Sequence, residues 1–172
     1  MNTMEQLFHS HGWTITLESA TLPDGRIAKR ARATFADTVH ILAFDKTQKI
    51  LLLREYRPFY GAYIWMLPSG HVDKESDQQI AARRELREET GFDARKITYL
   101  WNANSTEKIK NTNYFYHAEE LTHDPLPQDA DELIEVHALP VKEALEKILS
   151  SAKVHMASAY GVMRYMRENN LF

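Results

Sequence analysis

The chain of 172 residues contains no cysteine, so it can form neither a disulfide nor a thiolate metal site. It also lacks any run approaching the ~18 apolar residues that a membrane-spanning helix needs. Its first residues, Met1–Trp13, carry neither the basic flank nor the apolar stretch of a signal peptide. We therefore expect a soluble, cytoplasmic protein with no membrane partner, because a thiol-free chain suits a reducing compartment.

A strong charge of one sign is absent as well. The formal net charge is −3, which gives no general attraction to nucleic acid, and we expect no nucleic-acid partner. The sequence has no internal repeat, no low-complexity tract and no linker-like stretch, and 44% of its residues are hydrophobic. This length and composition predict one domain, residues 1–172, with a core of its own.

Apolar patterning predicts strands along most of the chain and helices near its C-terminal end. The predicted strands are Trp13–Thr21, Ile27–Thr34, Thr38–Phe44, Ile50–Tyr56, Ile64–Leu67, Lys96–Asn102, Asn113–His117 and Leu133–Leu139. Turn signals at Pro23-Asp24-Gly25 and Asp45–Lys49 predict that the first four strands form two pairs, and Leu121–Asp131 is predicted to be a polar loop. The predicted helices are a central one from Ser76 or Asp77 to Thr90, and two at about Val141–Ser150 and Met156–Asn169. This order predicts an α+β layered domain.

Three carboxylates lie near the end of the central helix. Glu85, Glu88 and Glu89 fall within an arc of roughly 100° on a helix that Gly91 is predicted to end. The helix dipole disfavours anions there, and each like-charged pair costs roughly 0.2–0.5 kcal/mol. Three hard oxygen donors on one face therefore predict a divalent cation, Mg²⁺ or alternatively Mn²⁺. The competing interpretation is an amphipathic surface helix with pairs such as Arg84–Glu88.

The stretch Gly70–Phe92 resembles the Nudix box, G-x5-E-x7-R-E-U-x-E-E-x-G-U, in which U is apolar. The matching positions are Gly70, Arg84, Glu85, Leu86, Glu88, Glu89, Gly91 and Phe92. The exception is Ser76, which stands where the pattern has its first glutamate, and Glu75 lies one residue earlier. We predict that Glu75 partly replaces the missing acid.

The neighbouring segments resemble ADP-ribose pyrophosphatase-type Nudix hydrolases. They are Arg54–Pro58, Leu67–Gly70 and Asp131–Val136. The resemblance covers nearly all of the chain and implies the Nudix α/β/α sandwich with a mixed sheet, preceded by antiparallel strands at about residues 13–34 that help to build a homodimer. It implies Mg²⁺-dependent hydrolysis of the pyrophosphate bond of ADP-ribose to AMP and ribose 5-phosphate.

The resemblance also implies roles for the box residues. Glu85, Glu88 and Glu89 would bind the metal together with the backbone carbonyl of Ser69, and Arg84 would orient a glutamate. A cation held in this way neutralises phosphate oxygens and lowers the pKa of a bound water molecule.

Hydrolysis further needs a group that accepts a proton from water. Glu132 matches the loop glutamate with that role in the subgroup. Asp129 and Asp131 are close enough in sequence to compete for it, and Glu132 could instead be a structural acid at a strand edge.

Three residues match substrate-binding positions of the subgroup. Trp13 would stack on adenine, and Arg57 and Arg54 would bind the substrate, Arg57 through its phosphate or ribose. The alternatives are a tryptophan that packs against the core and an arginine that is solvated at a strand end.

Two other functions stay open. The first is hydrolysis of other nucleoside diphosphate sugars or dinucleotides, because nothing in the sequence fixes the base or the sugar. The second is a non-catalytic, nucleotide-binding regulator with the Nudix fold. Retention of Arg84 and the three helix carboxylates argues against the regulator, whereas Ser76 leaves it open.

Overall fold

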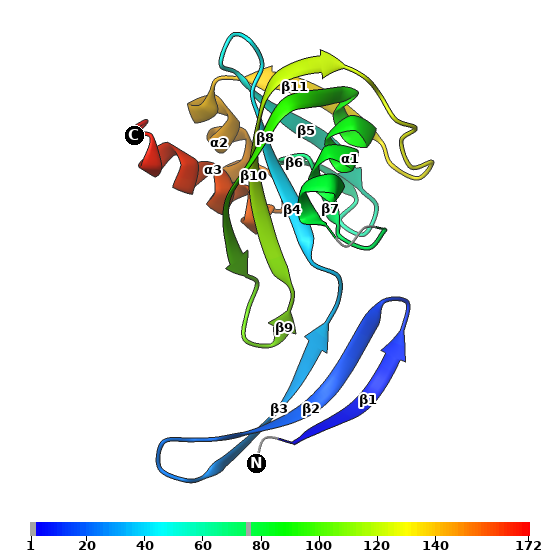
Figure 1. The fold of residues 1–172 in the computed structure, drawn as a ribbon, viewed down its shortest axis with the longest axis vertical. Coiled ribbons are helices and arrows are strands. Elements are labelled where there is room, and N and C mark those ends of the chain that lie inside the picture. The colour runs from blue at the N-terminus through cyan, green and yellow to red at the C-terminus, as the bar shows by residue number, and fades with distance from the viewer. Residues whose placement is uncertain (1–2, 75–76) are drawn as a thin grey trace.

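Three β-sheets and three helices form the part of the chain that is described, residues 3–74 and 77–172, in a computed structural model (Figure 1). The strands are β1 (Met4–Ser10), β2 (Trp13–Thr21), β3 (Ile27–Thr34), β4 (Thr38–Ala43), β5 (Ile50–Arg57), β6 (Ala62–Met66), β7 (Ser69–His71), β8 (Phe92–Asn104), β9 (Ile109–Lys110), β10 (Thr112–His123) and β11 (Ile134–Leu139). The helices are α1 (Gln78–Thr90), α2 (Val141–Leu149) and α3 (Met156–Glu168). None of these helices combines the length and the apolarity that crossing a membrane requires.

The N-terminal sheet has the order β1-β2-β3-β9 and extends away from the rest of the chain (Figure 1). β2 and β3 pair antiparallel as predicted, from Thr14↔Thr34 to Thr21↔Ile27. β1 was not predicted from the sequence, because nearly all of its side chains are exposed and a strand without a buried face shows no clear alternation. Glu18 of β2 forms an ion pair with Lys110 of β9. β9 lies between β8 and β10 in the chain, so it connects this sheet to the sheet that contains those two strands.

The other sheets have the orders β7-β4-β10-β8 and β11-β5-β6. β4 pairs parallel with β10 and antiparallel with β7, so that sheet is mixed. The predicted pairing of Thr38–Phe44 with Ile50–Tyr56 is wrong: an isolated bridge between Phe44 and Ile50 joins them, and each strand has its neighbours in a different sheet. Both strands are buried on both faces, so their patterning could not reveal their partners.

The structure also corrects the predicted ends of two strands. β8 begins at Phe92 rather than at Lys96, and β10 continues to His123, which shortens the predicted polar loop. The two strands pair antiparallel over most of their length, up to His123↔Phe92. The added ends, residues 92–95 and 118–123, consist mostly of polar residues, so apolar patterning did not reveal them, although the backbone pairing continues.

Alternate residues of β4 face two separate cores. Val39 and Ile41 pack with Ala81 and Leu86 of α1, whereas Leu42 belongs to the core beneath α2 and α3. Helices therefore cover both faces, with α1 on one side and α2 and α3 on the other (Figure 1). The α+β class and the α/β/α sandwich are confirmed.

Helix α1 has its predicted boundaries. The side chain of Asp77 accepts hydrogen bonds from the backbone N–H groups of Gln79 and Ile80 at the first turn. Gly91 ends the helix with φ = 77°, and its N–H donates to the carbonyl of Arg87. These local signals place the three box carboxylates in the last two turns.

Candidate active site

A cavity of about 610 Å³ lies where several elements meet. Its walls come from the first residues of β4, the end of β5, strand β7 and the loop after it, α1, the loop before β11, and the start of α3. Among the predicted site residues, those that line it are Arg57, Ser69, Arg84, Glu85, Glu89 and Glu132. The fold thus gathers residues that are far apart in the sequence into one cavity.

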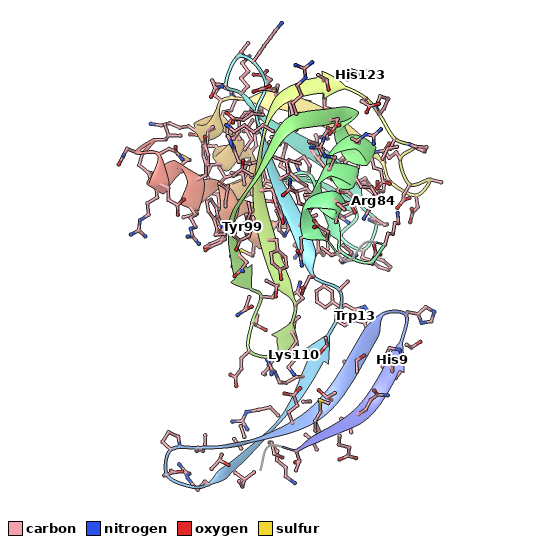
Figure 2. The ribbon with its side chains drawn as sticks, viewed as in Figure 1. His9, Trp13, Arg84, Tyr99, Lys110 and His123 are labelled. Atoms are coloured by element: carbon pink, nitrogen blue, oxygen red, sulfur yellow. The ribbon has the colours of Figure 1, made fainter. Side chains whose placement is uncertain are left out.

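Arg84 of α1, labelled in Figure 2, forms ion pairs with two of the box carboxylates. Its Nη1 lies 2.7 Å from Oε1 of Glu85 and 2.6 Å from Oε2 of Glu88. Its Nη2 donates to the backbone carbonyl of His71 at 3.1 Å, which connects α1 to β7. The arginine therefore contacts both glutamates, and the i,i+4 pair with Glu88 is part of this arrangement. That Arg84 orients a glutamate for catalysis stays a prediction.

Glu85 is largely buried beside Gly70, where a side chain would not fit. A Cβ built on Gly70 would lie 2.0 Å from the carboxyl carbon of Glu85. Burial raises the pKa of Glu85 to about 7, although the guanidinium of Arg84 opposes the shift; the charges of Glu88 and Glu132 raise it further. The carboxylate is thus held in a place where negative charge is unfavourable without a cation.

Glu89 is the most buried of the box acids, at 5% exposure. Its Oε2 accepts a hydrogen bond of 2.7 Å from the backbone N–H of Ser69. Burial raises its pKa well above the ordinary value, and the charges of Glu85 and Glu132 add to the shift. Ser69 itself lies in the cavity wall, so its backbone and the Glu89 carboxylate meet at this point.

The loop before β11 brings Glu132 and Asp129 to the same cavity. Glu132 is partly buried, and burial is the main cause of its raised pKa, followed by the charges of Glu55 and Asp129. Asp131 lines an adjoining pocket rather than this one. Two of the three candidate bases are therefore near the box acids, and the choice between them stays a prediction.

Glu55 is a fourth buried acid that sequence reasoning did not single out. It is 3% exposed, and burial raises its pKa, which the charge of Arg57 partly offsets. Its charge in turn raises the pKa values of Glu89 and Glu132. The sequence pattern could have revealed it. Glu55 follows Leu51 and Leu53 at intervals of two residues along β5, so its side chain is on the same, buried face of the strand.

The two predicted substrate-binding arginines lie on opposite sides of β5. Arg57 lines the cavity, and its Nη2 lies 2.9 Å from Oε2 of Glu55. Arg54 lies outside the cavity wall, where it pairs with Glu135 of β11 at 2.9 Å and stacks on Tyr63 of β6 at 4.0 Å. Of these two arginines, only Arg57 therefore lies in the cavity wall.

Trp13 lies where the N-terminal sheet approaches the rest of the chain (Figure 2). It is 42% exposed, and its ring centroid is 4.5 Å from that of Phe35. Phe35 lines the cavity and makes an edge contact with His71, whereas Trp13 does not line it directly. The structure therefore adds Phe35 as an aromatic residue at the cavity, and Trp13 is not a buried core tryptophan.

The profile of the NUDIX domain matches residues 34–160 of the chain. The chain belongs to the Nudix family. Over 166 residues it is 28% identical to the ADP-ribose pyrophosphatase of Bacillus subtilis, covering 95% of this chain and 89% of that protein. Over 147 residues it is 28% identical to the methanol dehydrogenase activator of Bacillus methanolicus, covering 84% of this chain and 80% of that protein.

A solved structure described as an ADP compounds hydrolase has the same fold. It superposes with a TM-score of 0.79 at 20% identity, covering 99% of this chain and 95% of that one. The predicted resemblance to ADP-ribose pyrophosphatase-like Nudix proteins and the predicted class of Nudix pyrophosphohydrolase are confirmed.

Nudix hydrolases generally use a divalent metal, and the donor set of this Nudix box suits one. Carboxylate oxygens are hard ligands, and burial and mutual repulsion raise the pKa values of Glu85 and Glu89, which a cation would relieve. Within the described ranges, no three His, Asp or Glu side chains are already grouped to hold an ion. Two of the acids, Glu85 and Glu88, each contact Arg84 through one carboxylate oxygen.

The departure of this chain from the Nudix box falls at Ser76. Ser76 and Glu75 lie outside the described residues, so replacement of the missing acid by Glu75 stays a prediction. Two variants test it. Glu75→Gln should reduce activity ~10-fold or more. Adding Ser76→Glu to Glu75→Gln should recover much of that loss.

Proposed function

We propose that this Nudix protein hydrolyses the pyrophosphate bond of ADP-ribose, with Mg²⁺, to AMP and ribose 5-phosphate. The observation that supports this most is the meeting of Glu85, Glu89 and Glu132 at one cavity, beside Arg57. A pyrophosphate carries negative oxygens that repel an attacking nucleophile, so its hydrolysis needs positive charge and a proton acceptor together. Relatives named as ADP-ribose pyrophosphatases support the choice of substrate.

The metal would be held by Glu85, Glu88, Glu89 and the carbonyl of Ser69. When bound, it would neutralise phosphate oxygens and make a water molecule more acidic. Arg84 keeps Glu85 and Glu88 directed along α1, as the contacts of 2.7 and 2.6 Å indicate.

Glu132 is proposed as the proton acceptor. Its raised pKa moves it closer to neutral pH, where a general base is most effective. Water adds its oxygen to one phosphorus and its proton passes to the Glu132 carboxylate. The bridging P–O bond breaks, and its electron pair leaves on the bridging oxygen, which stays with the departing phosphate monoester. Arg57 would contact the phosphates, with Glu55 holding its guanidinium at 2.9 Å. Phe35 and Trp13 would form an aromatic wall for adenine.

A substrate panel tests the proposal. ADP-ribose, other nucleoside diphosphate sugars and dinucleotides are incubated with Mg²⁺ or with EDTA, and AMP and sugar phosphate are separated by chromatography. We expect ADP-ribose to give the highest kcat/KM, EDTA to abolish turnover, and Glu89→Gln to lower kcat by at least ~10²-fold. Glu143→Gln, an exposed acid on α2, is the matched control and should behave as wild type.

Two results would change the conclusion. Preference for another nucleotide sugar would replace the substrate and keep the enzyme class. Absence of turnover on every compound would favour the non-catalytic regulator, an alternative that the relative named as an activator keeps relevant.

We also propose that the chain, residues 1–172, acts as one domain that forms a homodimer through its N-terminal strands. β1 is exposed along nearly its whole length, and Met4, Leu7, Phe8 and Ile27 present apolar side chains on the extended sheet. A second copy would cover these residues and could bring Trp13 or Arg54 to a neighbouring cavity. Light scattering at micromolar concentration should report twice the mass of one chain, and the mass of a single chain would refute the dimer.

A further inference from the structure

The loop between β10 and β11, residues 124–133, runs past the C-terminal end of α1 before it reaches the cavity (Figure 1). Its first residues are hydrogen-bonded to that helix end. The backbone N–H of Asp124 donates to the carbonyl of Gly91 at 3.0 Å, and the N–H of Leu126 donates to the carbonyl of Arg87 at 3.3 Å. The start of the loop is therefore fixed to the helix that carries the box acids.

The side chain of Arg87 adds two contacts at the same point. Its Nε donates to the backbone carbonyl of Asp124 at 2.9 Å, and its Nη2 lies 3.0 Å from Oδ2 of Asp124. A guanidinium can make both contacts at once because its donors form a planar fork. The side chain of Asp124 is 56% exposed, so the ion pair itself contributes little to stability. Arg87 does not line the cavity, and the Nudix box leaves its position unspecified.

Beyond Leu126 the loop has no further anchor until its far end. Within the described part of the chain, residues 127–132 form no hydrogen bond to another element; the N–H of Glu132 donates to the carbonyl of Asp129 at 3.2 Å inside the segment. The next anchor is Leu133, whose carbonyl accepts from the N–H of Tyr56 in β5 at 3.1 Å. Glu132 and Asp129, which line the cavity, therefore lie between two fixed points, one of which involves Arg87.

We propose that Arg87 is a positioning residue: it fixes the start of this loop and so sets where Glu132 lies relative to the carboxylates of α1. A loop that loses one anchor has a longer free segment and samples more positions. A misplacement of about 1 Å can cost roughly 100-fold in rate when reacting groups must be aligned. Because the anchor and the carboxylates belong to one helix, their spacing is constant. The inference rests on the proposed function, in which Glu132 accepts the proton.

Kinetics of matched arginine variants tests the inference. Arg87→Ala should lower kcat for ADP-ribose by about 10-fold, with KM and the Mg²⁺ concentration for half-maximal activity within about 2-fold of wild type. Arg87→Lys keeps a cation for Asp124 and should recover part of the loss. Arg83→Ala is the matched control and should keep kcat, because Arg83 lies one turn earlier on α1 and pairs with Asp93 of β8 rather than with the loop.

A second comparison shows whether Arg87 acts through Glu132. In the Glu132→Gln background no carboxylate is left at that position, so Arg87→Ala should cost at most about 2-fold further. A further loss of about 10-fold in that background would mean that Arg87 acts through another group, and it refutes the inference while hydrolysis itself stands. A raised Mg²⁺ requirement in Arg87→Ala, or an unchanged kcat, refutes it as well.

Hydrogen exchange gives a readout that needs no turnover. The backbone amides of Asp124 and Leu126, which are bonded to the end of α1, should exchange faster in Arg87→Ala than in wild type or Arg83→Ala. If wild type hydrolyses none of the substrates, the proposed function fails, and this measurement decides whether Arg87 holds the loop. Faster exchange at these two amides supports the inference, and unchanged exchange refutes it.

Discussion

Gly70 and Glu85 approach each other so closely that the carboxyl group occupies the space of a missing side chain. A Cβ on Gly70 would lie 2.0 Å from the carboxyl carbon and from Oε1 of Glu85. Gly70 is held in β7 by pairing with Val39 of β4, and Glu85 is held on α1 by Arg84. The glycine of the Nudix box thus determines where one proposed metal ligand lies.

Replacing this glycine should therefore affect activity more than stability. In Gly70→Ala the flexible end of Glu85 must move away, which we expect to lower kcat by about 10-fold or more with little change in Tm. Gly161→Ala is the matched control, because its Cβ would lie 2.7 Å from the ring of Phe115 in the core. That variant should lose Tm through overpacking, at a cost of roughly 1–3 kcal/mol, and keep its kcat. Measuring both kcat and Tm for each variant distinguishes a loss of activity from a loss of stability. Unchanged activity of Gly70→Ala would contradict the proposal that Glu85 is a metal ligand.

The buried acids predict an unusual pH dependence of the metal-free protein. The pKa of Glu85 is about 7 when folded and about 4.5 when unfolded, so its contribution to stability is complete below pH 4.5 and lost as the pH rises through 7. His40 and His155 act in the opposite sense, because their lowered pKa values make them stabilising above pH 6.5. Wild type must therefore be compared with Glu85→Gln rather than with itself at another pH.

The comparison gives a defined result. With EDTA present, Glu85→Gln should gain stability over wild type as the pH rises from about 5 to 8, by an amount on the order of 3 kcal/mol. Urea unfolding at several pH values measures the difference. A difference that stays constant with pH would mean that Glu85 is not in a strained, buried site. Saturating Mg²⁺ should reduce the difference, because the ion stabilises the ionised carboxylate.

The sequence was most informative where structure is local. The ends of α1 follow from Asp77 and Gly91. Helical spacing predicted one face for Glu85, Glu88 and Glu89, and of these Glu85 and Glu89 line the cavity. Strand pairing could not be inferred in the same way, because it joins residues far apart in the chain. The role of Glu55 depends on that pairing, since burial by neighbouring strands is what makes its charge part of the site.

Trp13 provides a test of substrate stacking. Because it is 42% exposed and rests on Phe35, Trp13→Ala should raise KM for an adenine substrate and change Tm little. A fully buried tryptophan would instead cost about 3–5 kcal/mol of stability. Trp65→Ala, which alters a tryptophan packed against the α2 core, serves as the control for loss of stability. A large fall in Tm with unchanged KM would contradict the stacking role.

Glu132 and Asp129 can be distinguished as proton acceptors because both line the cavity and differ in their surroundings. Burial and the charge of Glu55 raise the pKa of Glu132, so wild-type kcat should fall on acidification with an apparent pKa above the ordinary glutamate value. Glu132→Gln should lower kcat by ~10² or more and remove this acidic limb, without lowering Tm. Asp129→Asn is the matched variant and should keep both kcat and the limb. If Asp129→Asn shows the loss instead, the loop aspartate is the base; if neither variant does, the water is deprotonated by a group outside this loop.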